Sequence, residues 1–200
     1  MAQPPVADAQ LIARVLVHDD RHAFSELVRR YQSAVRATLR RLTAGNHALA
    51  DDLAQETFLL AYRNLKTFRQ EARFSTWLYR IATNAFLADA RKRKEVLLGD
   101  TVATVADDDE QGTPQTGNSG SDHTRSANLR MDLERALAVL SDGERAAIVQ
   151  CYHNDLSHEE AAYVLNCPLG TVKTHLLRGK QKLRAQLAAW APDGQEADHG

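Results

Sequence analysis

The 200-residue chain contains only two cysteines, Cys151 and Cys167, and only 6% aromatic residues. Two cysteines are too few for a disulfide framework, and without a Cys-x-x-Cys pair a structural zinc site is not expected. No apolar run approaches the roughly 18 to 20 residues that a membrane-spanning helix needs. The start Met1-Ala-Gln-Pro-Pro also lacks the basic and apolar blocks of a secretory signal. We therefore expect reduced thiols and a cytoplasmic protein without membrane insertion, metal or cofactor.

Motifs of the common enzyme classes are missing as well. The sequence has no Gly-rich phosphate loop, no His-x-Glu motif with cysteine pairs and no nucleophile elbow. Cys151 and His153 lie two positions apart, and on one helix such residues do not face each other. We expect a protein that is not an enzyme.

Charge is unevenly distributed, although the formal net charge is only −1. Residues 1–94 carry a net charge of +7, residues 95–127 carry −6 and residues 128–200 carry −2. Within the last of these, residues 171–190 hold five basic side chains and no acidic one. Two basic stretches on either side of an acidic segment favour a polyanionic partner that is contacted at two places.

Composition divides the chain into two helical domains and a connection. Residues 95–127 are rich in Gly, Ser, Thr and Asp and poor in large apolar residues, so they bury too little apolar surface to offset the entropy of ordering. We interpret them as a flexible acidic linker between domains at 1–94 and 128–190, with a tail at 191–200.

Apolar periodicity predicts an all-α fold. In the first domain, apolar residues recur at three- and four-residue steps from Phe24 to Leu42, which predicts a helix ending near Gly45. Further helices are expected around residues 11–17, over 47–65 and from about Ser75. No segment shows the period-two alternation of β-branched residues that is typical of strands.

The second domain carries clear helix-start signals. Ser141 with Glu144, and Ser157 with Glu160, match the capping box, which predicts helices from about residues 142 and 158. An earlier helix covers residues 129–140. A short turn ends at Pro168, and a further helix runs from there to about residue 189.

The helix from Ser157 and the basic helix after Pro168, joined by a three- or four-residue turn, have the layout of a helix-turn-helix. The N-terminal end of such a second helix reaches base edges, and residues further along reach phosphates. An ordinary helical hairpin with a solvated basic face is the alternative. The candidate duplex-DNA contacts are Arg145, Leu169, Thr171, Lys173, Thr174, His175, Arg178, Lys180 and Lys182.

Aromatic and cationic residues interleave over residues 68–84, and a basic run follows at 91–94. Such a surface can hold a phosphate backbone and stack on unpaired bases, at about 1–3 kcal/mol per stacked base. Phe74 and Trp77 could instead be core residues of a bundle, whereas Tyr79, Arg80 and Asn84 are the better contact candidates. The full candidate set is Arg69, Arg73, Phe74, Ser75, Thr76, Trp77, Tyr79, Arg80, Asn84, Arg91, Lys92 and Arg93.

A polar cluster opens the helix predicted over residues 47–65, in an otherwise basic domain. Acidic residues near a helix N-terminus are favourable with the helix dipole, which is one explanation. The other is a docking face for a basic protein partner. The candidate residues are Asp51, Asp52, Gln55, Glu56 and Leu59.

Four motifs in a fixed order resemble a known family. They are Asp51-Asp-Leu-Ala-Gln-Glu-Thr-Phe58, Phe74-Ser-Thr-Trp-Leu-Tyr-Arg-Ile-Ala-Thr-Asn84, Leu156-Ser-His-Glu-Glu-Ala-Ala162 and Gly170-Thr-Val-Lys-Thr-His-Leu-Leu-Arg178. The chain resembles bacterial RNA polymerase sigma factors of the extracytoplasmic-function (ECF) group, over both domains. The resemblance implies that residues 1–94 form the family's region 2 and residues 128–190 its region 4.

The resemblance also implies the partners: core RNA polymerase and promoter DNA. The cluster at residues 51–56 would meet the clamp helices of the largest polymerase subunit. Residues 69–84 would grip the −10 element and capture flipped bases of the non-template strand, and the helix after Pro168 would read the duplex −35 element. The acidic linker would run through the polymerase toward the RNA exit path.

Two features set this chain apart within that resemblance. Thr174 and His175 stand where many relatives have Ser-Arg, so a different −35 preference is expected. Because only residues 191–200 follow region 4, control is expected from another molecule, and an anti-sigma factor is a candidate partner. A stand-alone helix-turn-helix regulator with a helical N-terminal interaction domain is the alternative function.

Overall fold

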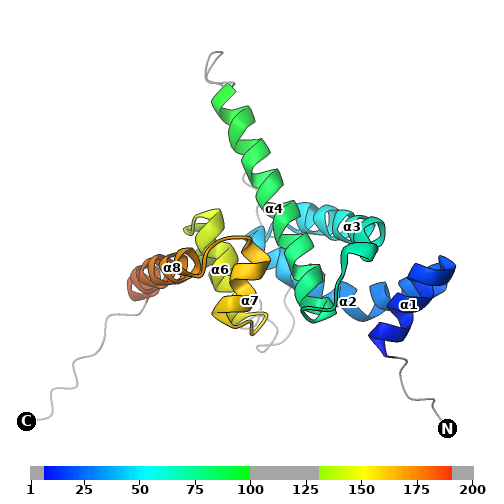
Figure 1. Ribbon diagram of the computed structural model, residues 1–200. Coiled ribbons are helices and arrows are strands. Elements are labelled where there is room, and N and C mark those ends of the chain that lie inside the picture. Colours follow the sequence, from blue (N-terminus) through cyan, green and yellow to red (C-terminus); the bar gives the residue numbers. More distant parts are fainter. Residues whose placement is uncertain (1–6, 100–130, 191–200) are drawn as a thin grey trace, which may run out of the picture.

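The computed structural model describes residues 7–99 and 131–190. All regular secondary structure within these two segments is helical (Figure 1), which confirms the predicted all-α class. Two parts of the chain named above lie outside the described residues: residues 100–127 of the predicted linker and the tail at 191–200.

The first segment is a bundle of four helices and one short turn of 3-10 helix. Helix α1 spans Asp8–His18, α2 spans Arg21–Leu42, α3 spans His47–Asn64, η1 spans Leu65–Thr67 and α4 spans Phe74–Gly99. Asp20 caps α2, its carboxylate accepting hydrogen bonds from the backbone N–H groups of His22 and Ala23, both at 3.0 Å. Asn46 caps α3 in the same manner. The helices expected in this segment are therefore confirmed.

Helix α4 corrects one predicted boundary. It continues to Gly99, so residues 95–99 are helical instead of belonging to a flexible linker. Glu95, Val96 and the two leucines that follow are compatible with a helix, and Gly99 is the first residue of low helix propensity in this run.

The second segment is a smaller helical unit. Residues 131–138 are helical, followed by α6 (Asp142–Tyr152), α7 (His158–Leu165) and α8 (Leu169–Trp190). Both predicted capping boxes are formed, at Ser141 and at Ser157. The backbone N–H of Thr171 donates to the carbonyl of Pro168 at 2.9 Å, so α8 begins where the proline was expected to start it.

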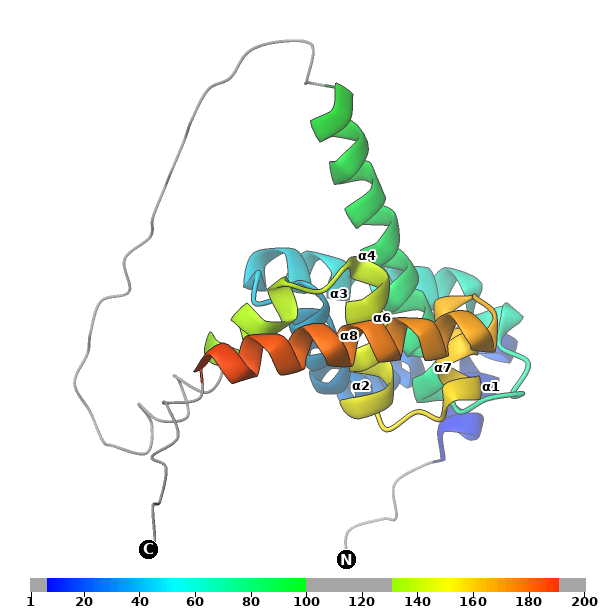
Figure 2. The same cartoon turned by 90° about the vertical axis from the view of Figure 1, so that its left-hand side faces the viewer.

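The two segments pack against each other. Helices α6 and α7 lie against α2 and α4 on one side and against α8 on the other (Figure 1). Figure 2 shows α8 crossing the outer side of this smaller unit. The apolar core is continuous, from Leu39 and Phe86 of the first segment to Val149 and Val164 of the second, all of them buried.

Candidate nucleic-acid and protein interfaces

A groove of about 560 Å³ runs between α2 and α3. Its lining is largely apolar, and Phe24 and Tyr62 meet across it edge to face, with ring centroids 4.9 Å apart. Arg21 and Arg36 lie at its border. The lining residues are Arg21, Phe24, Ser25, Val28, Gln32, Arg36, Ala54, Gln55, Phe58, Leu59 and Tyr62.

The predicted protein-docking residues border this groove. Gln55 and Leu59 line it, and the side chain of Leu59 is 59% exposed, which is high for a large apolar residue. Asp51 forms an ion pair with Arg36 at 3.5 Å, whereas Asp52 and Glu56 are exposed. The structure thus brings the predicted cluster together and adds a wall from α2.

Sequence reasoning missed that second wall. Phe24 and Val28 fit the apolar period of α2, which predicted a helix here and no groove. Both are only partly buried, because α3 crosses α2 without covering them. Only the packing of two helices creates the groove, so a single-helix pattern could not reveal it.

Several predicted single-strand contacts lie in the core. Phe74 and Trp77 are each 6% exposed and Thr76 is 1% exposed. The rings of Phe74 and Trp77 stack with centroids 5.6 Å apart, and Phe68 contacts both of them. Phe74 and Trp77 are therefore core residues in this structure, which is one of the two roles considered for them in the sequence.

A second cavity, of about 410 Å³, opens beside the loop that precedes α4. Its lining includes Tyr31, Phe68, Arg73 and Ser75. The hydroxyl of Tyr31 donates a hydrogen bond to Asp8, and burial together with this carboxylate raises the pKa of Tyr31 to about 12. The tyrosine therefore stays neutral at physiological pH.

The other candidates on and before α4 differ in accessibility. Ser75 and Tyr79 are partly buried, and burial raises the pKa of Tyr79. Arg80 is also partly buried, with its guanidinium carbon 4.4 Å from the ring centroid of Tyr163 on α7. Arg93 pairs with Asp89 at 2.8 Å. Six candidates are exposed, Arg93 among them: Arg69, Arg73, Asn84, Arg91, Lys92 and Arg93.

Helices α7 and α8 form the predicted helix-turn-helix pair. Asn166 ends α7 in the left-handed conformation, at φ 52° and ψ 46°, which turns the chain sharply toward Pro168. The first half of α8 presents an exposed polar face, and the hydroxyl of Thr174 donates to the carbonyl of Gly170 at 2.9 Å. Along α8 the exposed candidates are Lys173, Thr174, Arg178, Lys180 and Lys182, whereas Leu169, Thr171 and His175 are partly buried.

Two of the basic candidates on α8 have partners within the protein. Lys180 lies over the ring of Tyr152, with its ammonium 5.0 Å from the centroid. Lys182 donates to Glu144 at 2.7 Å. Burial favours a raised pKa for Glu144, but the hydrogen bonds from Lys182 and Ser141 outweigh burial, and the pKa of Glu144 lies below its ordinary value.

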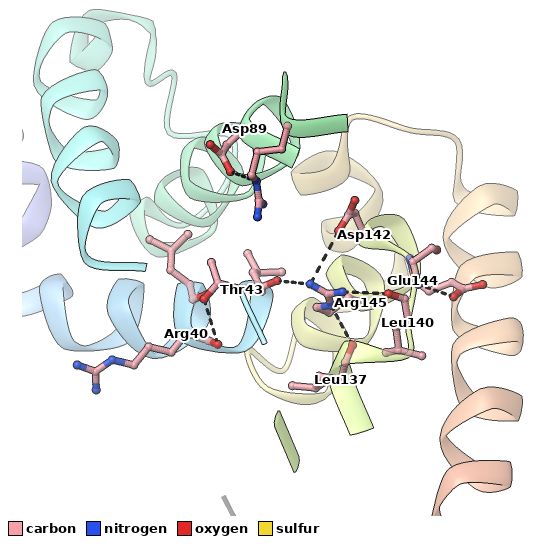
Figure 3. A network of polar contacts seen from close by, with 12 residues as sticks. Arg40, Thr43, Asp89, Leu137, Leu140, Asp142, Glu144 and Arg145 are labelled. Atoms are coloured by element: carbon pink, nitrogen blue, oxygen red, sulfur yellow. Dashed lines mark hydrogen bonds and ion pairs between the residues drawn. The ribbon is translucent and has the colours of Figure 1, made fainter. Parts of the chain in front are cut away.

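Arg145 sits at the junction of the two segments. Figure 3 shows its guanidinium pointing toward backbone carbonyls: it donates to Leu137 at 3.0 Å, to Leu140 at 3.0 Å and to Leu42 at 2.8 Å. Asp142 lies 3.8 Å away, and the side chain is only 12% exposed. Burial lowers the pKa of Arg145. In this arrangement Arg145 links protein groups, and its predicted contact with DNA stays a prediction.

The described segments offer neither a membrane-spanning helix nor a metal-binding cluster. No helix within residues 7–99 or 131–190 has the length and apolar content to cross a membrane. In the same ranges, no group of three or more His, Cys, Asp or Glu side chains is placed to hold a metal ion.

Comparison with known proteins gives the same family for both segments. Residues 27–96 match the family model described as Sigma-70 region 2, and residues 130–183 match the model described as Sigma-70, region 4. The ECF RNA polymerase sigma factor SigW of Bacillus subtilis is 35% identical over 170 residues, which covers 84% of this chain and 90% of SigW. The ECF RNA polymerase sigma-E factor of Escherichia coli K12 is 33% identical over 183 residues, covering 89% and 93% of the two chains.

Solved structures of similar fold include two that were determined as complexes. The sigma factor RpoE, in complex with the anti-sigma factor NepR from Bartonella quintana, superposes with a TM-score of 0.62 at 25% identity, over 82% of this chain and 96% of that one. CnrH, in complex with the cytosolic domain of CnrY, superposes with a TM-score of 0.63 at 25% identity, over 92% of this chain and 99% of that one.

Proposed function

Because this chain belongs to the ECF group of the sigma-70 family, we infer that it binds core RNA polymerase and directs it to promoters for the initiation of transcription. The observation that carries this conclusion is the presence of region 2 and region 4 in the family's order, on two helical segments of one chain. This function accounts for the findings better than a stand-alone helix-turn-helix regulator does, since the N-terminal segment is itself a sigma region. Polymerase performs the chemistry, and the chain acts by binding, in the cytoplasm where polymerase works.

The groove between α2 and α3 is proposed as the docking face for polymerase. An exposed apolar residue such as Leu59 beside carboxylates such as Asp52 and Glu56 suits a partner helix that carries both apolar and basic side chains. The ion pair between Asp51 and Arg36 holds one of the carboxylates in position at the edge of the groove.

Region 2 is proposed to hold the melted −10 element. Exposed cations at Arg69, Arg73, Arg91 and Lys92 can neutralise phosphates along the surface of α4 and its preceding loop. Stacking on unpaired bases falls to partly exposed rings such as Tyr79, because Phe74 and Trp77 are buried.

Region 4 is proposed to read the −35 element through α8. Lys173 and Thr174 are exposed in the first turns of α8, where a recognition helix approaches base edges, and Arg178 follows where phosphates are reached. An anti-sigma factor is proposed as a further partner, since the structural neighbours RpoE and CnrH were solved in complex with NepR and CnrY.

Run-off transcription tests the function itself. Purified core polymerase is incubated with a pool of genomic promoter fragments, with and without this chain. Discrete transcripts that require the chain are expected, and their aligned start regions would give the −10 and −35 sequences. If no transcript depends on the chain, and the chain alone binds duplex DNA tightly, the stand-alone regulator replaces this proposal.

Two substitutions test the division of labour. Lys173→Ala removes an exposed cation from α8 and is expected to weaken −35-dependent binding by the holoenzyme about tenfold, with polymerase affinity unchanged. Asp52→Ala is expected to lower polymerase affinity and leave the promoter preference of the assembled holoenzyme intact. Titration of each variant against core polymerase, and of each holoenzyme against promoter DNA, checks both. Equal effects of both variants in both titrations would contradict separate roles.

A further inference from the structure

One large apolar side chain is exposed in the first half of α8. Leu177 is 60% exposed, whereas Val172 and Leu176 of the same helix are buried. Single leucines on a protein surface are common and by themselves indicate nothing. The position of Leu177 on α8 is what gives it a meaning.

Leu177 lies on the side of α8 that points away from the core. Gly179, two positions further on, is buried against α6, where an added Cβ would lie 3.1 Å from Cγ1 of Ile148. With about 3.6 residues per turn, positions two apart lie on opposite sides of a helix. Leu177 instead shares its side with residues three, four and seven positions earlier, all of them exposed. We call Gly170, Lys173, Thr174 and Leu177 the outer face of α8.

The two residues that set this chain apart within its family have partners inside the protein. The hydroxyl of Thr174 donates to the carbonyl of Gly170 at 2.9 Å, so its proton is already used within α8. The ring of His175 is partly buried and lies against the first turn of α6, where a Cβ added at Gly143 would be 2.9 Å from its Cε1. In this arrangement neither side chain donates a hydrogen bond outward from the outer face.

Gly170 leaves the start of the outer face bare. A Cβ added there would meet nothing within 4 Å, so packing inside the described segments does not require a glycine at this position. Gly170 lies in the first turn of α8, where glycine is unfavourable for the helix. A missing side chain does, however, allow another molecule to approach the backbone closely. Close approach at Gly170 brings the following two turns, and with them Leu177, nearer to the same partner.

From this placement we propose that Leu177 reads the −35 element, by apolar contact with the 5-methyl group of a thymine in the major groove. The inference rests on the proposed role of α8 in −35 binding. Thymine is the base that displays a methyl group in the major groove, and apolar side chains recognise it by contact. Leucine offers no hydrogen bond to the polar edges of the other bases. The contact therefore selects thymine at one position of the −35 element.

Replacing thymine with uracil tests this contact, because uracil keeps the base pair and lacks only the methyl group. Three versions of a promoter fragment identified by run-off transcription are compared: unmodified, with uracil throughout the −35 element, and with uracil only in the spacer between the two elements. For holoenzyme with the wild-type chain, we expect the Kd of the −35 uracil fragment to be about fourfold higher than that of the unmodified fragment, the effect of one methyl group returned to water. The spacer fragment is expected to bind like the unmodified one.

Two alanine variants assign the contact to a residue. Leu177→Ala removes an exposed side chain and leaves the core intact, and its holoenzyme is expected to bind the unmodified and −35 uracil fragments equally. Leu16→Ala makes the same chemical change at a 48% exposed leucine on α1 and is expected to keep the wild-type difference. Circular dichroism of both variants checks that their helical content is unchanged.

The outcomes that overturn the proposal are distinct. Equal Kd values of the wild-type holoenzyme for the unmodified and −35 uracil fragments overturn it, as do a −35 element without thymine and an equal effect of uracil in the spacer. A difference that persists in Leu177→Ala assigns the methyl contact to another side chain and also overturns it. Transcripts that require the chain, followed by any of these results, mean that the sigma function stands and the role of Leu177 fails. If no transcript requires the chain, both fail.

Discussion

Glu144 and Glu160 occupy equivalent places in two capping boxes, but their surroundings differ. Each carboxylate accepts a hydrogen bond from the backbone N–H of the capping serine at 2.9 Å. Glu144 is 5% exposed and also pairs with Lys182, whereas Glu160 is partly exposed. Substituting each glutamate in turn therefore distinguishes what a capping box contributes to the free energy of unfolding from what the ion pair with Lys182 adds.

We predict that Glu160→Ala lowers the free energy of unfolding by about 1 kcal/mol, the usual contribution of a capping interaction. Glu144→Ala is expected to cost roughly 2–3 kcal/mol, because it also leaves Lys182 without its charged hydrogen-bond partner. Urea denaturation of the full chain, followed by circular dichroism, measures both. Equal losses would show that the ion pair adds nothing to the cap.

The same pair has a defined pH dependence. The pKa of Glu144 lies below its ordinary value of 4.5, so the folded state binds this proton less readily than the unfolded state. The stability due to its charge is then fully present above about pH 4.5 and is lost as the pH falls through the lowered pKa. The excess loss in Glu144→Ala over Glu160→Ala is expected to shrink in the same range.

At single residues, the sequence predicted local roles better than tertiary ones. Both capping boxes were predictable, because Ser and Glu at three-residue spacing interact within one turn. Arg145 was grouped with the duplex contacts, whereas in the structure its guanidinium donates to three carbonyls, those of residues 42, 137 and 140. No local pattern contains a contact with residue 42.

At the scale of elements, the turn between α7 and α8 depends on one unusual backbone conformation. Asn166 has φ 52° and ψ 46°, a conformation that asparagine and glycine adopt at lower cost than alanine. This turn fixes the direction in which α8 leaves α7, and hence the orientation of the residues that are proposed to contact DNA.

We predict that Asn166→Ala destabilises the chain by about 1 kcal/mol relative to Asn166→Gly. Both variants lose the amide that contacts Arg80, so the difference between them isolates the backbone term. Urea or thermal unfolding of the two variants provides the measurement. Equal stability of the two would mean that the turn adopts another conformation.

Element starts and ends were predictable where a local signal exists. The starts of α6, α7 and α8 follow from Ser141, Ser157 and Pro168, each of which acts within one turn. The end of α4 was misplaced because residues 95–99 were grouped with the acidic sequence after them, although the first residue of low helix propensity there is Gly99. The groove between α2 and α3 was missed because it requires two helices packed together.

At the scale of the whole molecule, the arrangement of the two segments could not be predicted. The contact between Thr38 and Asn154 joins residues 116 positions apart, and neither residue has a pattern that identifies the other. Charge, in contrast, is additive along the chain, so the concentration of positive charge in residues 1–94 was visible at once. The sequence therefore predicted the kind of partner but not the packing of the two segments against each other.

The positive charge of residues 1–94 should make the affinity of the free chain for single-stranded DNA depend on salt concentration. Arg91 and Lys92 are exposed on α4, while their neighbour Arg93 is paired with Asp89. Each phosphate neutralised by a cation adds about 0.7 to the slope of log affinity against log salt for a single strand. If Arg91 and Lys92 each contact one phosphate, replacing both with glutamine lowers the slope by about 1.4.

The control for this prediction keeps the net charge equal. Arg40 on α2 and Arg63 on α3 are exposed and lie away from the proposed strand path, so replacing both with glutamine removes the same two charges. Titration of a labelled oligonucleotide at several salt concentrations is expected to give a near wild-type slope for this second variant. If the slope of log affinity against log salt falls equally in the two double variants, binding depends on net charge alone and the proposed path along α4 is wrong. A long-range field would not distinguish the two pairs of basic residues, whereas direct phosphate contacts would.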